Sequence, residues 1–149
     1  MSGAGRLLGV DHGTVRIGLA VSDPDRKIAF PLTTYTIRNR EQDARYFAQV
    51  VADEQVTGIV VGLPVHTDGR EGERAKAARA FGTWLREATG QPVVYWDERF
   101  TTVQAESALW DAGLTHKRRR ERRDRVAAQM LLQAYLEAGC PEEQAPGPL

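Results

Sequence analysis

The first third of the chain has the apolar pattern of three short strands. Residues 6–11 and 16–22 are apolar runs joined by a polar, glycine-bearing link, which is typical of a β-hairpin. Residues 28–37, IAFPLTTYTI, predict a third strand. Pro31 places that strand at a sheet edge, because proline cannot donate a ladder hydrogen bond. We expect an antiparallel meander here.

After this meander the apolar residues recur at helical spacing. The period predicts an amphipathic helix over residues 40–55, with apolar positions at Ala44, Phe47, Val50 and Val51. The mostly apolar run at 57–64 is rich in β-branched residues, which favours a strand that is buried on both faces of a parallel sheet.

The second half of the chain continues with alternating helices and strands. A polar loop precedes a second helix that Gly90 ends, and residues 92–96 predict another strand. The apolar stripe of that helix is Ala77, Phe81, Trp84, Leu85 and Ala88. Thr101 and Gln104 fit a capping box that opens a short helix ending near Gly113. The last helix covers roughly 119–138, and its predicted stripe is Ala127, Met130, Leu131, Ala134 and Tyr135.

Three meandering strands followed by α/β crossovers are the element order of the ribonuclease-H-like fold. We therefore expect a single α/β domain over residues 1–139, with a mixed five-stranded sheet in the order 3-2-1-4-5 and flanking helices. Residues 140–149 contain three prolines and little to bury, so we expect a disordered tail.

Composition narrows the functional classes. The 20 basic and 20 acidic residues cancel, so any attraction to a polyanion must be local. A single cysteine, Cys140, excludes a disulfide framework within the chain. There is no signal-peptide pattern and no apolar run near the roughly 20 residues of a membrane span, so we expect a cytoplasmic protein.

Three acidic residues occupy informative positions. Asp11 ends the first strand, Glu98 follows the last strand, and Asp124 lies near the start of the last helix on its apolar side. Converging carboxylates repel one another, and divalent cations such as Mg²⁺ or Mn²⁺ relieve that repulsion. Two such ions would activate water and stabilise the leaving oxygen of a phosphodiester. We expect Asp11 to bridge the ions, with Glu98 and Asp124 each holding one side.

Ordinary roles for these acids compete with the catalytic one. Asp11 suits a turn, Glu98 suits an ion pair with Arg99, and Asp124 suits the positive end of a helix. In a 3-2-1-4-5 sheet, moreover, Glu98 must reach back across roughly two strand spacings of about 4.8 Å. Asp97 is therefore an alternative ligand.

A basic segment covers residues 116–125, HKRRRERRDR. Cations oppose the dipole at a helix N-terminus, so their presence there favours an anionic partner over a merely solvated helix end. The residues expected to contact nucleic-acid phosphates are Arg16, Lys117, Arg118, Arg119, Arg120, Arg122 and Arg123. His12 and His66 lie in predicted loops, where each would either orient water or phosphate or have no role.

Four segments resemble the YqgF-type proteins, also called the RuvX family. They are GVDHGTVRIGLAVSD at 9–23, IVVGLPVHTDGREG at 59–72, DERFTT at 97–102, and RDRVAAQMLLQAYL at 123–136. The resemblance implies a metal-dependent nuclease with Asp11, Glu98 and Asp124 as its acidic positions. It implies processing of the 5′ end of pre-16S rRNA during ribosome biogenesis or, alternatively, resolution of four-way DNA junctions.

Other functions remain open at this point. VDHGT also resembles the first phosphate loop of actin-like ATP-handling proteins, although those need two such domains. A non-catalytic RNA-binding factor is a third reading. Ribosomal particles are candidate partners, no membrane partner is expected, and the oligomeric state is either monomer or homodimer, the latter suiting symmetric junction cleavage.

Overall fold

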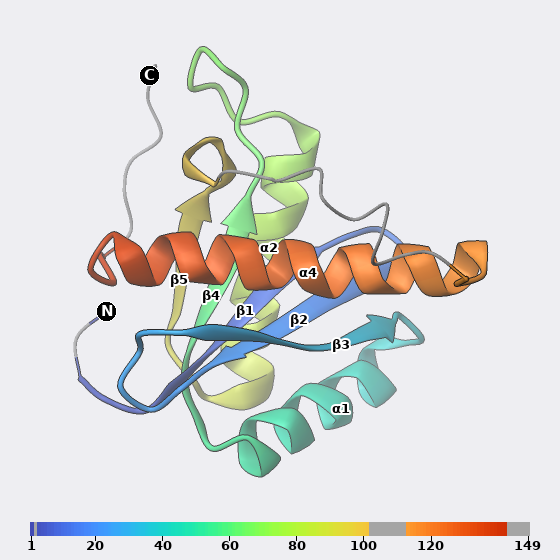
Figure 1. The fold of residues 1–149 in the computed structure, drawn as a ribbon, viewed down its shortest axis with the longest axis horizontal. Coiled ribbons are helices and arrows are strands. Elements are labelled where there is room, and N and C mark those ends of the chain that lie inside the picture. The colour runs from blue at the N-terminus through green and yellow to red at the C-terminus, as the bar shows by residue number, and fades with distance from the viewer. Residues whose placement is uncertain (2, 102–112, 143–149) are drawn as a thin grey trace.

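A computed structural model describes residues 1, 3–101 and 113–142 of the chain. Its centre is a five-stranded sheet in the order β3-β2-β1-β4-β5 (Figure 1). The strands are β1 Arg6–His12, β2 Arg16–Ser22, β3 Ala29–Thr36, β4 Val56–Leu63 and β5 Val93–Asp97. Strands β1, β2 and β3 pair antiparallel, whereas β4 pairs parallel with β1 and with β5. The predicted mixed sheet and its order are confirmed.

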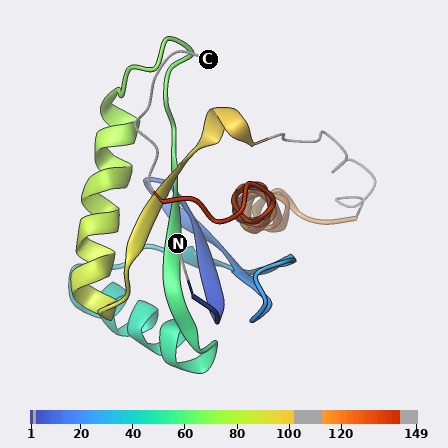
Figure 2. The ribbon, with the colours of Figure 1, turned by 90° about the vertical axis from the view of Figure 1, so that its left-hand side faces the viewer.

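Helices cover both faces of this sheet. They are α1 Arg40–Asp53, α2 Glu73–Thr89 and α4 His116–Glu137, and a 3-10 turn, η1, covers Glu98–Phe100. Figure 2 shows α1 and α2 on one side of the sheet and α4 alone on the other. Each face of the sheet therefore packs on its own core.

The two cores follow from the alternation of side chains along each strand. On β1, Leu8 and Val10 pack with Phe47 of α1 and Leu85 of α2. Leu7, the residue before Leu8, points to the other face of the sheet and packs against α4 instead. The core residues contributed by α4 are Ala128, Leu131, Leu132, Tyr135 and Leu136.

Strand β3 is an edge strand, as Pro31 predicts. It pairs only with β2, and Pro31 stands opposite Ala20 where the register of the two strands shifts. A proline at such an irregularity removes no regular ladder hydrogen bond. No helix in the described part of the chain is long and apolar enough to cross a membrane.

The helices differ from prediction in two respects. The buried residues of α2 are Ala75, Ala78, Gly82 and Leu85. The buried face therefore shares Leu85 with the predicted stripe but is rotated about the helix axis away from Ala77. Helix α4 begins earlier than predicted, at His116, with the Thr115 hydroxyl as its cap. The predicted helix between Gln104 and Gly113 lies almost wholly outside the described residues, as does the tail from 143.

Candidate active site

Asp11 lies at the carboxyl end of β1, on the face of the sheet that α4 covers. The alternation along β1 fixes this face, because Asp11 lies two residues beyond Gly9 and four beyond Leu7. A Cβ at Gly9 would lie 2.8 Å from Leu132 Cβ of α4, and Leu7 belongs to the α4 core. The carboxylate of Asp11 is thus held beneath this helix, partly buried.

Glu98 reaches toward Asp11 across β4 because β4 has no side chain in the way. Gly62 precedes the end of β4, and a Cβ there would lie 2.7 Å from Glu98 Oε1. The Glu98 carboxylate therefore rests on the bare backbone of Gly62. This position explains how a residue beyond β5 interacts with Asp11 on β1, two strands away in the sheet.

Asp124 comes from α4, which approaches the sheet very closely at Gly18 of β2. A Cβ at Gly18 would lie 1.9 Å from the Asp124 carbonyl oxygen, so only glycine leaves room for the helix backbone. Arg16 Nε donates to Asp124 Oδ2 at 2.6 Å. This ion pair is about three-quarters buried, with side-chain exposures of 29% and 26%.

The three carboxylates influence one another electrostatically. Burial raises the pKa of Asp11 to about 6, helped by the negative charge of Asp124 and opposed by Arg74. Burial likewise raises the pKa of Glu98 to about 7, helped by Asp11 and Asp97 and again opposed by Arg74. Asp11 is therefore the centre of the group, since it is coupled to both other acids.

Arg74 was missed by sequence reasoning. It lies in the first turn of α2, and its positive charge lowers the pKa of both Asp11 and Glu98. An exposed arginine at a helix start has no distinctive sequence pattern, so only the fold shows that it faces this group. It gives the acidic site a cationic border on the side of α2.

The donor chemistry of the site suits a hard divalent cation. Within the described residues, no three His, Cys, Asp or Glu side chains converge closely enough to hold a metal as they stand. Asp11 and Glu98 interact as a pair, while Arg16 holds the Asp124 carboxylate. Carboxylate oxygens are what Mg²⁺ and Mn²⁺ prefer, and a bound cation would offset both the burial and the repulsion that raise the two pKa values.

Asp97 points to the opposite face of the sheet. Its carboxylate accepts from the Arg99 guanidinium, with an Arg99 Nη2 to Asp97 Oδ2 distance of 2.6 Å, and from the Arg99 backbone at 2.9 Å. It is buried, and it caps η1. These contacts give Asp97 a structural role and favour Glu98 as the acid that faces Asp11.

The basic segment forms the first turns of α4 and crosses the edge of the sheet. The Thr34 hydroxyl of β3 donates to the Glu121 carbonyl there. Lys117, Arg118 and Arg120 are exposed, while the Arg119 Nε is buried without a hydrogen-bond partner. Arg122 and Arg123 both interact with other residues. The segment leads directly into Asp124, so the positive charge lies next to the carboxylates.

Of the two candidate histidines, His12 lies on the other face of the sheet from the carboxylate group. The His12 ring belongs to the other face of the sheet, where it stacks on Phe81 with the centroids 4.5 Å apart. Burial lowers the pKa of His12, so its ring is neutral near pH 7. His66 is exposed and lines a cavity of about 220 Å³ together with Gly72 and Arg74.

Comparisons with known proteins place this architecture. Over 97% of this chain and 99% of the other, it superposes with a TM-score of 0.57 and 17% identity on Thermus thermophilus RuvC in complex with a Holliday junction substrate. A Fowlpox virus resolvase with Holliday junction DNA gives 0.52 at 10% identity, covering 91% of this chain and 99% of that one. At these identities the likeness shows the shared ribonuclease-H-like fold.

Sequence relatives are much closer. A protein of Rhodopirellula baltica named "Putative pre-16S rRNA nuclease" is 47% identical over 134 residues, which are 90% of this chain and 78% of that protein. A Rhodobacter capsulatus protein of the same name is 47% identical over 133 residues, which are 89% and 84% of the two chains. The family model described as "RuvX: Holliday junction resolvase" matches residues 5–138. The chain therefore belongs to the RuvX family, and it is a nuclease, a hydrolase of phosphodiester bonds.

Proposed function

We propose that this protein is a metal-dependent endonuclease that processes the 5′ end of pre-16S rRNA. The observation that carries the proposal is the meeting of Asp11 and Glu98 across the bare backbone of Gly62, with Asp124 coupled to Asp11 from the helix above. Three acids from β1, η1 and α4 serve no evident packing purpose at this one edge of the sheet.

Each acid has a proposed role. Asp11, Glu98 and Asp124 would hold Mg²⁺ or Mn²⁺, and we expect two such ions. Such ions supply a deprotonated water and neutralise charge on the phosphodiester when they are bound. Asp11 interacts with both other acids and is the expected shared ligand. Burial raises the pKa of Glu98 to about 7 in the metal-free chain, so this carboxylate would also be able to orient a water molecule.

Arg16 has a role that follows from its ion pair. It holds the Asp124 carboxylate at 2.6 Å and so keeps the acid directed at this edge of the sheet. If the Asp124 carboxylate held a cation, the Arg16 guanidinium beside it would be available to bind a substrate phosphate. Lys117, Arg118, Arg119 and Arg120, with Arg122 and Arg123, would then bind backbone phosphates along the start of α4, independently of base sequence.

The substrate is proposed from the relatives. Those at 47% identity are named for pre-16S rRNA, whereas the family model is described by Holliday junction resolution. We favour the RNA substrate because the relatives at 47% identity are named for it, and junction resolution is the second candidate. With an rRNA substrate we expect the protein to act in the cytoplasm with ribosomal particles as partners. Such a substrate requires no more than a monomer. A homodimer would suit paired junction cuts.

Cleavage of labelled RNA precursor and of a four-way DNA junction tests the proposal. We expect cutting that requires Mg²⁺ or Mn²⁺ and is lost in Asp11→Asn. Asp25→Asn, which neutralises an exposed loop acid, is the matched control and should retain activity. If the folded wild type binds RNA without cutting it, and calorimetry shows no metal binding, the protein is an RNA-binding factor. ATP hydrolysis abolished by Asp11→Asn would instead support an actin-like function.

A further inference from the structure

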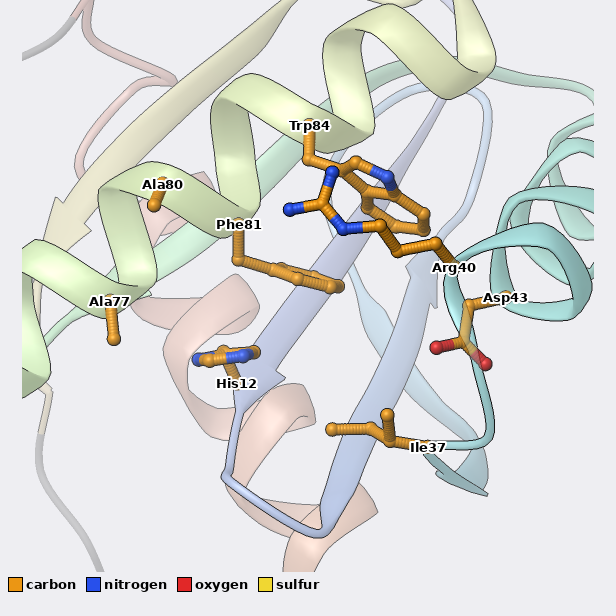
Figure 3. Close-up of a pocket in the computed structure, with 8 residues that line it drawn as sticks. All are labelled: His12, Ile37, Arg40, Asp43, Ala77, Ala80, Phe81 and Trp84. Atoms are coloured by element: carbon orange, nitrogen blue, oxygen red, sulfur yellow. The ribbon is translucent and has the colours of Figure 1, made fainter.

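A groove lies on the face of the sheet opposite the carboxylates. Its volume is about 340 Å³, within the size range of small-ligand sites. The lining residues are His12, Ile37, Arg40, Asp43, Ala77, Ala80, Phe81 and Trp84. Figure 3 shows α2 with its alanine and aromatic side chains on one side, Ile37, Arg40 and Asp43 on the other, and His12 between them.

Aromatic rings form a column along this groove. The His12 and Phe81 rings are 4.5 Å apart and inclined by 23°, and Phe81 and Trp84 are 5.4 Å apart and inclined by 31°. His12, Phe81 and Trp84 are all only partly buried, and the flanking Ala77 and Ala80 are exposed. Small exposed residues beside a stack of partly exposed rings leave room for another planar group.

Polar groups at the rim show which planar group fits. Asp43 is buried, and both hydrogen bonds described to its carboxylate, from the Tyr35 hydroxyl at 2.5 Å and the Arg38 amide at 3.0 Å, end on Oδ1. Its Oδ2 is left to accept from an amino group. Arg40 is exposed at the start of α1 and forms no ion pair within the described part of the chain, so it suits a phosphate.

We infer that this groove binds an unstacked base of the substrate strand, with preference for a base that carries an exocyclic amino group. The inference rests on the proposed nuclease function: His12 follows Asp11 at the end of β1, so a strand that crosses this sheet edge from the carboxylates would reach the groove on the other face. Aromatic rings provide stacking platforms for single-stranded bases, and a carboxylate accepts from the N4 amino group of cytosine. An apolar protein side chain would offer no hydrogen-bond donor to Asp43 Oδ2 and no anion to Arg40.

Filling the groove tests this inference. In the Asp11→Asn background, which prevents cutting, Ala80→Leu should weaken binding of a single-stranded oligocytidine roughly tenfold or more, because one stacked base is lost. Ala48→Leu, at an exposed alanine of α1 outside the groove, should bind like the background protein. Both changes keep a strong helix former at an exposed position, and thermal unfolding verifies that both proteins fold.

Base preference gives a second measurement that needs no loss of packing. Oligocytidine should bind severalfold more tightly than oligouridine, which has a carbonyl in place of the amino group, and Asp43→Asn should remove that difference. Equal affinity of Ala80→Leu and Ala48→Leu for oligocytidine, with wild type that cleaves RNA, overturns the groove alone. Absence of both RNA binding and cleavage overturns the nuclease proposal as well. A change in self-association without a change in RNA affinity makes the groove a protein interface and also refutes the inference.

Discussion

Asp11→Asn should make the metal-free protein more stable at pH 8, although it destroys the proposed site. Burial beneath α4 and the charge of Asp124 make ionisation of Asp11 unfavourable in the folded state. Moving its pKa from 3.8 to about 6 corresponds to about 3 kcal/mol of free energy of unfolding. Asparagine has nearly the same shape and carries no charge, so most of this penalty should disappear.

The sign of the effect depends on pH. Below about pH 3 the Asp11 carboxyl is protonated in both the folded and the unfolded chain, so the variant and the wild type should be equally stable. Between about pH 3 and pH 6 the unfolded chain releases its proton first, and the wild type loses stability. Above about pH 7 the full difference is present. The gain from Asp11→Asn should therefore grow with pH and then level off.

Thermal unfolding followed by circular dichroism in EDTA measures this effect. A gain of about 3 kcal/mol in a domain of this size raises the midpoint by roughly 6–12 °C at pH 8 and by about a fifth of that at pH 4. Asp124→Asn is the control, because Arg16 already compensates the Asp124 charge. That variant should be no more stable than wild type at pH 8. An Asp11→Asn protein that is less stable than wild type at pH 8 would refute the electrostatic reasoning.

Four further outcomes follow from the geometry. Mg²⁺ should raise the unfolding midpoint of wild type at pH 8 but not that of Asp11→Asn, since a ligand stabilises only the state that binds it. Gly62→Ala should abolish cleavage with only a modest loss of stability, because its Cβ would meet the flexible Glu98 carboxylate at 2.7 Å and only the end of the Leu131 side chain at 3.0 Å. Gly18→Ala should instead lower the free energy of unfolding in urea by about 3 kcal/mol, because its Cβ would meet helix backbone at 1.9 Å. Replacing Arg118 and Arg119 with alanine should flatten the salt dependence of RNA binding, and an unchanged slope would remove the basic segment from the interface.

The fold could be predicted because its signals are local. Short apolar runs and the glycine, proline or polar residues that bound them predict three features: the hairpin, the edge strand with Pro31 and the buried strand at Val56–Leu63. The buried face of α2 could not be predicted, because its alanines at 75, 77, 78 and 80 are alike in hydropathy. The aromatic residues Phe81 and Trp84 shifted the predicted stripe toward a groove that leaves them partly exposed.

The three acids remain a prediction as a catalytic set, and their surroundings could not be predicted from the sequence at all. Strand order placed Glu98 two strands from Asp11, and nothing in the sequence showed how it reached back. The answer depends on Gly62, whose importance appears only when the registers of β1, β4 and β5 are known. Arg74 could not be predicted for the same reason, since its electrostatic interaction with Asp11 arises from the packing of α2 on the sheet rather than from sequence spacing.

Gly18, which lies beneath α4, limits the substitutions that this protein can accept during evolution. At Gly18 the helix backbone occupies the space of a side chain, so even alanine is destabilising although glycine contributes no chemistry. Exposed positions of α4 beyond the basic segment can vary more freely by comparison. In a library of random variants, substitutions at Gly18 should therefore be depleted as strongly as those at the acids, and screening for loss of activity alone would mistake a spacing requirement for a catalytic one.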